Sequence, residues 1–250
     1  MKVGFLITGR MKSTRLKRKL TIEVEGRQIV RWMIDRIKLS KFVSEIVLCT
    51  SLNGDDDILE QIAKEEGIKS FRGHEEDVIS RLNDAAMSFG FDFVLNITAD
   101  CPLVSFEYID TIVETYRNNN EYDLIRCLDL PHGFFSYGIK PSALAEVCRI
   151  KKDINTEVWG RYFADTGLFR VYDLEIPESF HRPNYRLTLD YPEDLDFFKS
   201  LYAHWGERTY KAASSDIIEY LDRNPEIVDL NKSCKELYQQ RWDSQNKLVL

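Results

Sequence analysis

Short apolar segments alternate with helical patterns along the chain, and this alternation restricts the fold more than any other feature. Val3–Ile7, Val43–Leu48 and Phe91–Ile97 are apolar runs of strand length. Each precedes a stretch in which apolar residues recur at helical spacing, as they do in Gln28–Lys38. Strands that alternate with helices in this way form parallel sheets covered by helices on both faces. The sequence therefore predicts an open α/β sheet.

The segment after the first predicted strand is strongly basic. Arg10–Lys19 contains six basic residues and no acid, although the 250-residue chain has a net charge of -7. The segment begins where open α/β sheets bind their ligands, past the carboxyl end of a strand. Its charge favours a polyanion such as a nucleoside triphosphate, but a solvated basic face would show the same charges. It is not a Walker loop, because Arg10 replaces the lysine that should follow Gly9.

Composition argues against several classes of function. The acidic balance disfavours general nucleic-acid binding, because the basic charge is concentrated in one loop. The N-terminal apolar run ends at Ile7 and is too short for a signal sequence or a membrane span, so we expect a cytoplasmic protein without membrane contact. The five cysteines are an odd number without a CxxC pair, which favours reduced thiols over a disulfide set or a metal cluster.

Aspartates follow two of the predicted strands. Asp100 comes shortly after Phe91–Ile97, and Asp190 ends a predicted final strand, Tyr185–Asp190. Because parallel strands place their carboxyl ends at the same edge of a sheet, the two carboxylates should converge there. Two bare carboxylates at close range repel each other unless a cation lies between them. The alternative role for Asp100 is to cap the turn before Pro102.

Other acidic residues have explanations in helix chemistry. Asp55–Asp57 precede a predicted helix, where their charges would complement the helix dipole. A metal-binding motif of a nucleotide-sugar glycosyltransferase is the alternative for these three residues. Glu193 and Asp194 follow Pro192 and open another predicted helix, as first-turn residues do.

The basic segment and later parts of the chain resemble one enzyme family. Arg10-x-x-Ser13-x-Arg15-x-x-x-Lys19-Leu20 resembles the signature of the cytidylyltransferases that activate acidic sugars. These include the acylneuraminate and 3-deoxy-manno-octulosonate enzymes and a branch similar to the spore-coat polysaccharide cytidylyltransferase. Residues 71–78, 94–102 and 186–195 resemble further motifs of the family, in the same order. The spore-coat-like branch usually carries Pro-Gly where this chain has Lys17-Arg18.

The resemblance implies a three-layer α/β/α, Rossmann-like nucleotide-diphospho-sugar transferase fold with a mostly parallel sheet and a small insertion, in a single domain, residues 1–250. It also implies that an acidic sugar attacks the α-phosphate of CTP, that pyrophosphate leaves and that a CMP-sugar forms. The nucleotide-binding residues that it implies are Gly9, Arg10, Ser13, Arg15, Lys19, Arg72, Asp77 and Thr98. The resemblance assigns catalysis to Arg10, Lys19 and Asp100, and it assigns a Mg²⁺ cofactor to Asp100 and Asp190.

The middle of the chain departs from the regular alternation. Residues 128–184 are rich in aromatic side chains and read as an insertion, for which an ordinary core is the alternative interpretation. In the resembled family the matching region forms the acceptor pocket and an arm that builds a homodimer. Glu157 stands where the spore-coat-like branch tends to carry a histidine, so the acceptor itself stays open.

Two other functions remain compatible with the sequence. A nucleotide-sugar glycosyltransferase would use Asp55–Asp57 and release no pyrophosphate, and a non-catalytic protein would bind CTP without turnover. The C-terminal tail has two helical patterns, Ser214–Leu221 and Ser233–Tyr238, which we expect to pack against the domain without taking part in chemistry.

Overall fold

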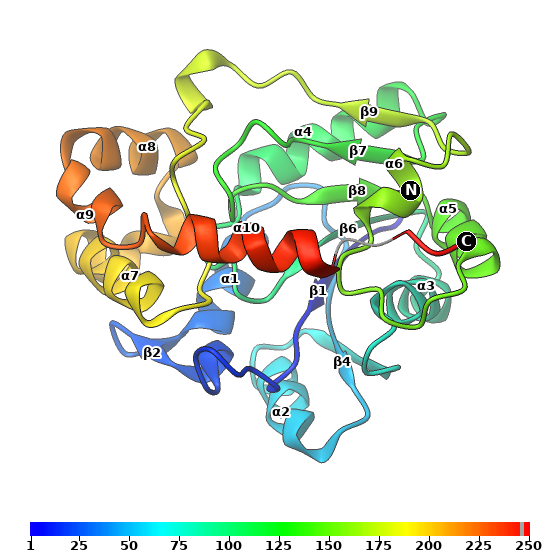
Figure 1. The fold of residues 1–250 in the computed structure, drawn as a ribbon, viewed down its shortest axis with the longest axis horizontal. Coiled ribbons are helices and arrows are strands. Elements are labelled where there is room, and N and C mark those ends of the chain that lie inside the picture. The colour runs from blue at the N-terminus through cyan, green and yellow to red at the C-terminus, as the bar shows by residue number, and fades with distance from the viewer. Residues whose placement is uncertain (246–247) are drawn as a thin grey trace.

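A seven-stranded sheet forms the centre of the molecule, as the computed structural model shows for residues 1–245 and 248–250 (Figure 1). The strand order is β5-β4-β1-β6-β8-β7-β9, so β6 is the middle strand. All neighbours are parallel except β8, which runs antiparallel to β6 and β7. The strands are β1 (Val3–Thr8), β4 (Glu45–Ser51), β5 (Lys69–Gly73), β6 (Phe93–Thr98), β7 (Leu124–Arg126), β8 (Tyr137–Ile139) and β9 (Val171–Asp173). The predicted mostly parallel α/β sheet is confirmed.

Helices cover both faces of this sheet. The longer ones are α1 (Ile29–Ile37), α2 (Asp57–Glu65), α3 (Val78–Phe89), α4 (Phe106–Asn118), α5 (Pro141–Ile150), α7 (Pro192–Trp205), α8 (Ser214–Arg223) and α10 (Cys234–Gln245). Two single-turn helices, α6 (Gly160–Ala164) and α9 (Pro225–Asp229), and a hairpin of β2 (Glu23–Val24) and β3 (Arg27–Gln28) complete the fold. None of the described helices is both long enough and apolar enough to cross a membrane.

Alternate residues of the central strands face two separate hydrophobic cores. Phe5 and Ile7 of β1 point into the core formed with α1, α2, α4, α7 and α8, whereas Leu6 points into the core formed with α3, α5 and α6. All six residues of β1 are buried, as expected for a strand covered on both sides. Thr8, the last residue of β1, pairs with both Cys49 and Thr98, so three strands end at one edge. That edge is where the polar segments of the chain meet.

Two expectations about the second half of the chain need correction. Tyr185–Asp190 is not a strand: it is an extended segment whose single β-bridge joins Arg186 to His132. One side of this segment is buried, which explains its alternating polarity. Its backbone forms hydrogen bonds with loops such as the one at Asp100. Residues 128–184 do break the parallel alternation, yet β8 and β9 of this region extend the main sheet.

The C-terminal helix α10 lies across the front of the molecule, from α9 toward β8 and α6 (Figure 1). Tyr238 of α10 packs against His132 with ring centroids 4.6 Å apart, and Arg241 forms an ion pair with Glu157 at 3.3 Å. This helix therefore joins the loops that surround the carboxyl edge of the sheet.

Candidate active site

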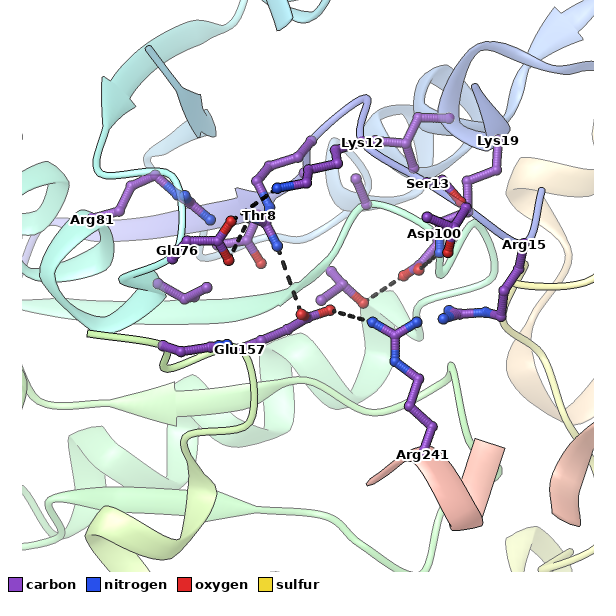
Figure 2. Close-up of a pocket in the computed structure, with 18 of the residues that line it drawn as sticks. Thr8, Lys12, Ser13, Arg15, Lys19, Glu76, Arg81, Asp100, Glu157 and Arg241 are labelled. Carbon is purple, nitrogen blue, oxygen red and sulfur yellow. Dashed lines mark hydrogen bonds and ion pairs between the residues drawn. The ribbon is translucent and has the colours of Figure 1, made fainter. Parts of the chain in front are cut away.

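A cavity of about 300 Å³ opens at the carboxyl edge of β1 and β6. We call it the basic pocket, because one wall is the segment Arg10–Lys19, the basic loop. Its other walls come from the loop after β6, the start of α3, the loop before α6 and α10. Charged side chains dominate the lining; they are Arg10, Lys12, Arg15, Lys19, Glu76, Arg81, Asp100, Glu157 and Arg241. Figure 2 labels all of them except Arg10.

A buried aspartate holds the basic loop in place. Asp56 accepts hydrogen bonds from the Met11 amide at 2.6 Å and from the Ser51 amide at 3.2 Å. Its side chain also accepts from the Ser51 hydroxyl. Burial opposes ionisation of this carboxyl group, but these hydrogen bonds prevail and lower its pKa. Asp56 therefore shapes the loop instead of merely starting a helix, a role that its place in the Asp55–Asp57 run did not reveal.

Asp100 and Asp190 converge on the ammonium group of Lys19. Lys19 Nζ donates to Asp190 Oδ1 at 2.8 Å and forms a short ion pair with Asp100. The two backbone segments are held together because the Leu189 amide donates to the Asp100 carbonyl at 2.9 Å. The structure thus brings together two aspartates that are 90 residues apart, and a cation does lie between their carboxylates.

Three cations surround Asp190. Arg15 and Lys19 contact Oδ1, and Arg186 Nη2 donates to Oδ2 at 2.7 Å. Burial alone would raise the pKa of Asp190, but the charges of Lys19 and Arg186 outweigh it and lower the pKa well below its usual range. The carboxylate is therefore ionised at neutral pH.

Asp194 supports this centre from behind. Its fully buried carboxylate accepts from Arg186 Nε at 2.9 Å, from the Asp190 amide at 2.8 Å and from Asn231 Nδ2 at 3.0 Å. It also accepts from the Tyr191 amide at the start of α7. The helix-start role expected from the sequence is present, but Asp194 additionally fixes the guanidinium group that holds Asp190.

The donor set suits a magnesium ion that binds together with a nucleotide. Asp100 and Asp190 present oxygens to one position, which the Lys19 ammonium group occupies. Among the described residues no group of three or more His, Cys, Asp or Glu side chains is arranged to hold a metal ion. Mg²⁺ is commonly held by one or two carboxylates with phosphate oxygens and water as the remaining ligands. The two aspartates could hold such an ion only with ligands of this kind.

The cations of the basic loop are paired with acidic groups. Arg10 Nη1 donates to the Glu75 carbonyl at 2.8 Å, and Arg10 lies 3.4 Å from Glu76 and 3.7 Å from Glu157. Lys12 pairs with Glu76 at 3.2 Å. These pairs are partly exposed and therefore weak, so a polyanionic ligand can replace them.

Most of the predicted site residues line the basic pocket, but Arg72, Asp77 and Asp190 do not, although Asp190 contacts Arg15 and Lys19 of the wall. Gly9, Arg10, Ser13, Arg15, Lys19, Thr98 and Asp100 all contribute to its wall. Arg72 lies outside, where its guanidinium group contacts the Ser51 and Asn53 carbonyls and the Asp57 carboxylate. Asp77 caps α3 behind the wall by accepting from the Ser80 amide, and it forms a short ion pair with Lys151.

The pocket also contains residues that the sequence did not identify. Arg81 comes from the buried side of α3, and Arg241 comes from α10, a helix that the sequence predicts to pack without a part in the site. The sequence does contain a signal for Arg81: this arginine lies on the apolar face of a helix, beside Val78, Ile79 and Leu82. Arg241 gave no such signal, because its place in the site depends on how the tail folds back.

A second cavity of about 550 Å³ adjoins the first. We call it the aromatic pocket, because its lining includes Phe135, Tyr137, Trp159, Tyr238 and Trp242. Thr98, Glu157 and Trp159 line both cavities. Burial and the nearby Arg186 lower the pKa of His132, on the wall of this pocket, to about 4, so its imidazole is neutral at pH 7. The two pockets could thus hold two substrates side by side.

Comparison with known proteins decides the family. A sequence model described as cytidylyltransferase matches residues 5–246. The chain belongs to the cytidylyltransferase family. This cytidylyltransferase is 31% identical over 231 residues to the spore coat polysaccharide biosynthesis protein of Bacillus subtilis, across 90% of this chain and 95% of that protein. It is 29% identical over 126 residues to the 3-deoxy-manno-octulosonate cytidylyltransferase of Bdellovibrio bacteriovorus, across 50% of this chain and 49% of that one.

A solved structure extends the likeness to the whole fold. The structure of a cytidylyltransferase from Leptospira borgpetersenii matches with a TM-score of 0.84 at 28% identity, and the match covers 100% of this chain and 99% of that chain. The resemblance noted in the basic loop and the later segments is thereby confirmed at the level of the family, and the protein is a nucleotidyltransferase.

Proposed function

We propose that this cytidylyltransferase transfers CMP from CTP to an acidic sugar and releases pyrophosphate. One observation carries the proposal: the basic loop, with Lys19, and Asp100 line one pocket, Asp190 pairs with that lysine, and a second pocket with aromatic walls adjoins the first. A triphosphate fits the first pocket by charge, and a sugar ring fits the second, since aromatic faces pack against apolar surface while polar groups fix orientation.

Each side chain of the basic pocket has a role in this reaction. Nucleotidyl transfer requires positioning of the reactants and neutralisation of charge more than covalent help from the protein. Arg10, Lys12 and Arg15 would bind the phosphates, and Lys19 would exchange one of its carboxylate partners for a phosphate oxygen of the leaving pyrophosphate. Mg²⁺, held by Asp100 and Asp190, would supply further neutralisation of the triphosphate charge.

The acceptor would approach the α-phosphate from the aromatic pocket. Thr98 and Glu157 stand at the junction of the two pockets, within reach of groups on both sides. The cations on the wall of the aromatic pocket, Arg126 and Arg161, support an acceptor that carries a carboxylate. Arg126 is held in place by Asp173, to which Nε and Nη2 donate at 2.6 and 2.7 Å. The similarity to a spore coat polysaccharide biosynthesis protein and to a 3-deoxy-manno-octulosonate cytidylyltransferase supports the same class of acceptor.

Nucleotide choice tests the first half of the proposal. With Mg²⁺ present, CTP is expected to raise the melting temperature more than ATP, GTP or UTP. A ligand at about 100 times its dissociation constant adds roughly 2.7 kcal/mol of stability, which corresponds to about 5–10 °C for a chain of this length. Differential scanning fluorimetry measures the shift, and equal shifts with all four nucleotides would contradict the cytidine assignment.

Release of pyrophosphate separates the proposed reaction from its alternatives. A coupled pyrophosphate assay with CTP, Mg²⁺ and a panel of nonulosonic and octulosonic acids should show turnover with at least one acceptor and none without CTP. A non-catalytic CTP-binding protein would give a melting shift but no pyrophosphate. The glycosyltransferase alternative has lost its structural support, because Asp56 is bonded to the basic loop and Asp57 to Arg72.

We further propose that the protein is a cytoplasmic homodimer. Its five cysteines are free thiols, which suits a reducing compartment. The region 128–184 exposes the apolar side chains of Leu128, Ile154 and Leu168, and in the described part of the chain β9 forms one edge of the sheet. Pairing of two copies would cover these groups. Light scattering at micromolar concentration is expected to give twice the 29.3 kDa of one chain, and a monomer would contradict the proposal.

A further inference from the structure

Arg81 occupies the end of the basic pocket that lies away from the phosphate-binding cluster. Figure 2 shows Arg81 and Glu76 on one side of the cavity, and Asp100, Lys19 and Arg15 on the other. If the triphosphate lies along the basic loop toward Asp100, the far end is left for the base. Val78 of α3 adds an apolar surface there, as a planar ring requires.

The guanidinium group of Arg81 is only half used by the protein. Nη1 donates to the carbonyls of His74 and Glu75, the latter at 3.1 Å. Nε is buried without a hydrogen-bond partner, and Nη2 donates no hydrogen bond to the part of the chain that the structure describes. Nε and Nη2 form one edge of the planar group, so two parallel N–H donors remain available.

This charge is buried without a carboxylate partner. Arg81 is 1% exposed, and it forms no ion pair within residues 1–245 and 248–250. A buried and unpaired guanidinium group is costly to the folded state. Two backbone carbonyls accept hydrogen bonds from Nη1, but the donors on the Nε edge have no acceptor among the described residues. Such a group is expected where a ligand supplies the missing acceptors.

The orientation of Arg81 is fixed by its surroundings. The stem packs under β5, where a Cβ placed on Gly73 would lie 3.1 Å from Arg81 Cγ. Arg10 donates to the same Glu75 carbonyl as Arg81, at 2.8 Å, and Glu76 lies 3.4 Å from Arg10. The guanidinium group of Arg81 and the carboxylate of Glu76 therefore lie close to one backbone carbonyl, that of Glu75.

That arrangement matches cytosine and mismatches uracil. Cytosine presents two adjacent acceptors, O2 and N3, and one donor, the N4 amino group. A planar fork of two N–H donors can bond O2 and N3 together, and a carboxylate can accept from N4. Uracil places an N3–H donor against the fork and the O4 acceptor against the carboxylate, so both contacts would be repulsive or unpaired.

We infer that Arg81 selects cytosine by donating from Nε and Nη2 to O2 and N3 of the base. This inference rests on the proposed use of CTP and adds the residue that reads the base. Arg72, which was predicted to bind the nucleotide, does not line the pocket, because its guanidinium group contacts Asp57 and two backbone carbonyls.

A modified nucleotide tests the contact in the unaltered protein. 3-Deaza-CTP replaces N3 by a C–H group and so removes one acceptor while it keeps O2 and the amino group. Calorimetry with Mg²⁺ should show that the wild-type protein binds CTP about 10- to 100-fold more tightly than 3-deaza-CTP or UTP, a typical value for one bidentate contact to a base. Equal affinities for CTP and 3-deaza-CTP, with UTP still weak, would overturn the inference and leave the proposed function intact.

Two variants complete the test. Arg81→Lys keeps the charge and a bond to the carbonyls but lacks the fork, so its preference for CTP over UTP and 3-deaza-CTP should fall to within about threefold. Arg72→Lys, a matched change outside the pocket, should keep the wild-type preference. Retention of the preference in Arg81→Lys, or its loss in Arg72→Lys, would overturn the inference. If Arg81→Lys does not fold, the wild-type comparison decides. Failure of the wild type to bind CTP would overturn the proposed function itself.

Discussion

Replacement of Asp100 by asparagine is expected to lower the rate of pyrophosphate release by about two to three orders of magnitude, a typical loss for one electrostatic contact in a transition state. The substitution keeps the shape of the side chain but removes the charge that faces Lys19 and the proposed metal. It should not unfold the protein, because Lys19 keeps its second partner, Asp190, at 2.8 Å. The measurement is kcat under saturating CTP and Mg²⁺, with the acceptor that gives the highest turnover.

Asp57→Asn is a suitable control for this change. Asp57 is also a carboxylate paired with a cation, but its partner is Arg72 outside the pocket. Its substitution should leave kcat within about twofold of wild type, since the side chain is exposed and such pairs contribute little. Near-normal turnover of Asp100→Asn with Mg²⁺ would contradict the role assigned to Asp100.

The second large effect is expected on stability. Asp194→Asn should lower the free energy of unfolding by about 3–5 kcal/mol, because it leaves the buried Arg186 with one fewer carboxylate and turns an acceptor into a donor. For a chain of this length that corresponds to a fall of about 6–20 °C in melting temperature. A first-turn helix acid without this ion pair would contribute only about 0.3–1 kcal/mol.

Glu193→Gln separates the two explanations. Glu193 is in the same first turn of α7 but is exposed, so its substitution removes a similar charge from the helix start without touching Arg186. Thermal unfolding of both variants in the same buffer gives the comparison. Similar small losses in both would show that Asp194 acts through the helix dipole alone.

The parts of the molecule that the sequence predicted well are those with local causes. Val3–Ile7 and Phe91–Ile97 became β1 and β6 because continuous apolar runs suit strands covered on both faces. The basic loop lies at the end of β1 because it follows that strand directly along the chain. Asp100 is at the site for the same reason, since it comes two residues after β6.

The errors arose where side chains depend on distant parts of the chain. Tyr185–Asp190 has the alternation of a strand, but alternation reports which side chains are buried and not whether the backbone has a partner strand. Arg72 lies within the motif at residues 71–78, and Arg81 follows it by a few residues. Which of the two faces the pocket depends on the packing of α3. Arg241 reaches the site only because α10 folds back across the edge of the sheet.

The position of Lys19 between two carboxylates has a consequence for the order in which the proposed ligands would bind. A pair of aspartates that already holds an ammonium group has little attraction left for a stray divalent ion, because its charge is neutralised within the chain. In the proposed reaction a triphosphate would offer Lys19 a competing anion and so release the aspartate oxygens. A divalent ion would then bind together with the nucleotide and not to the resting protein.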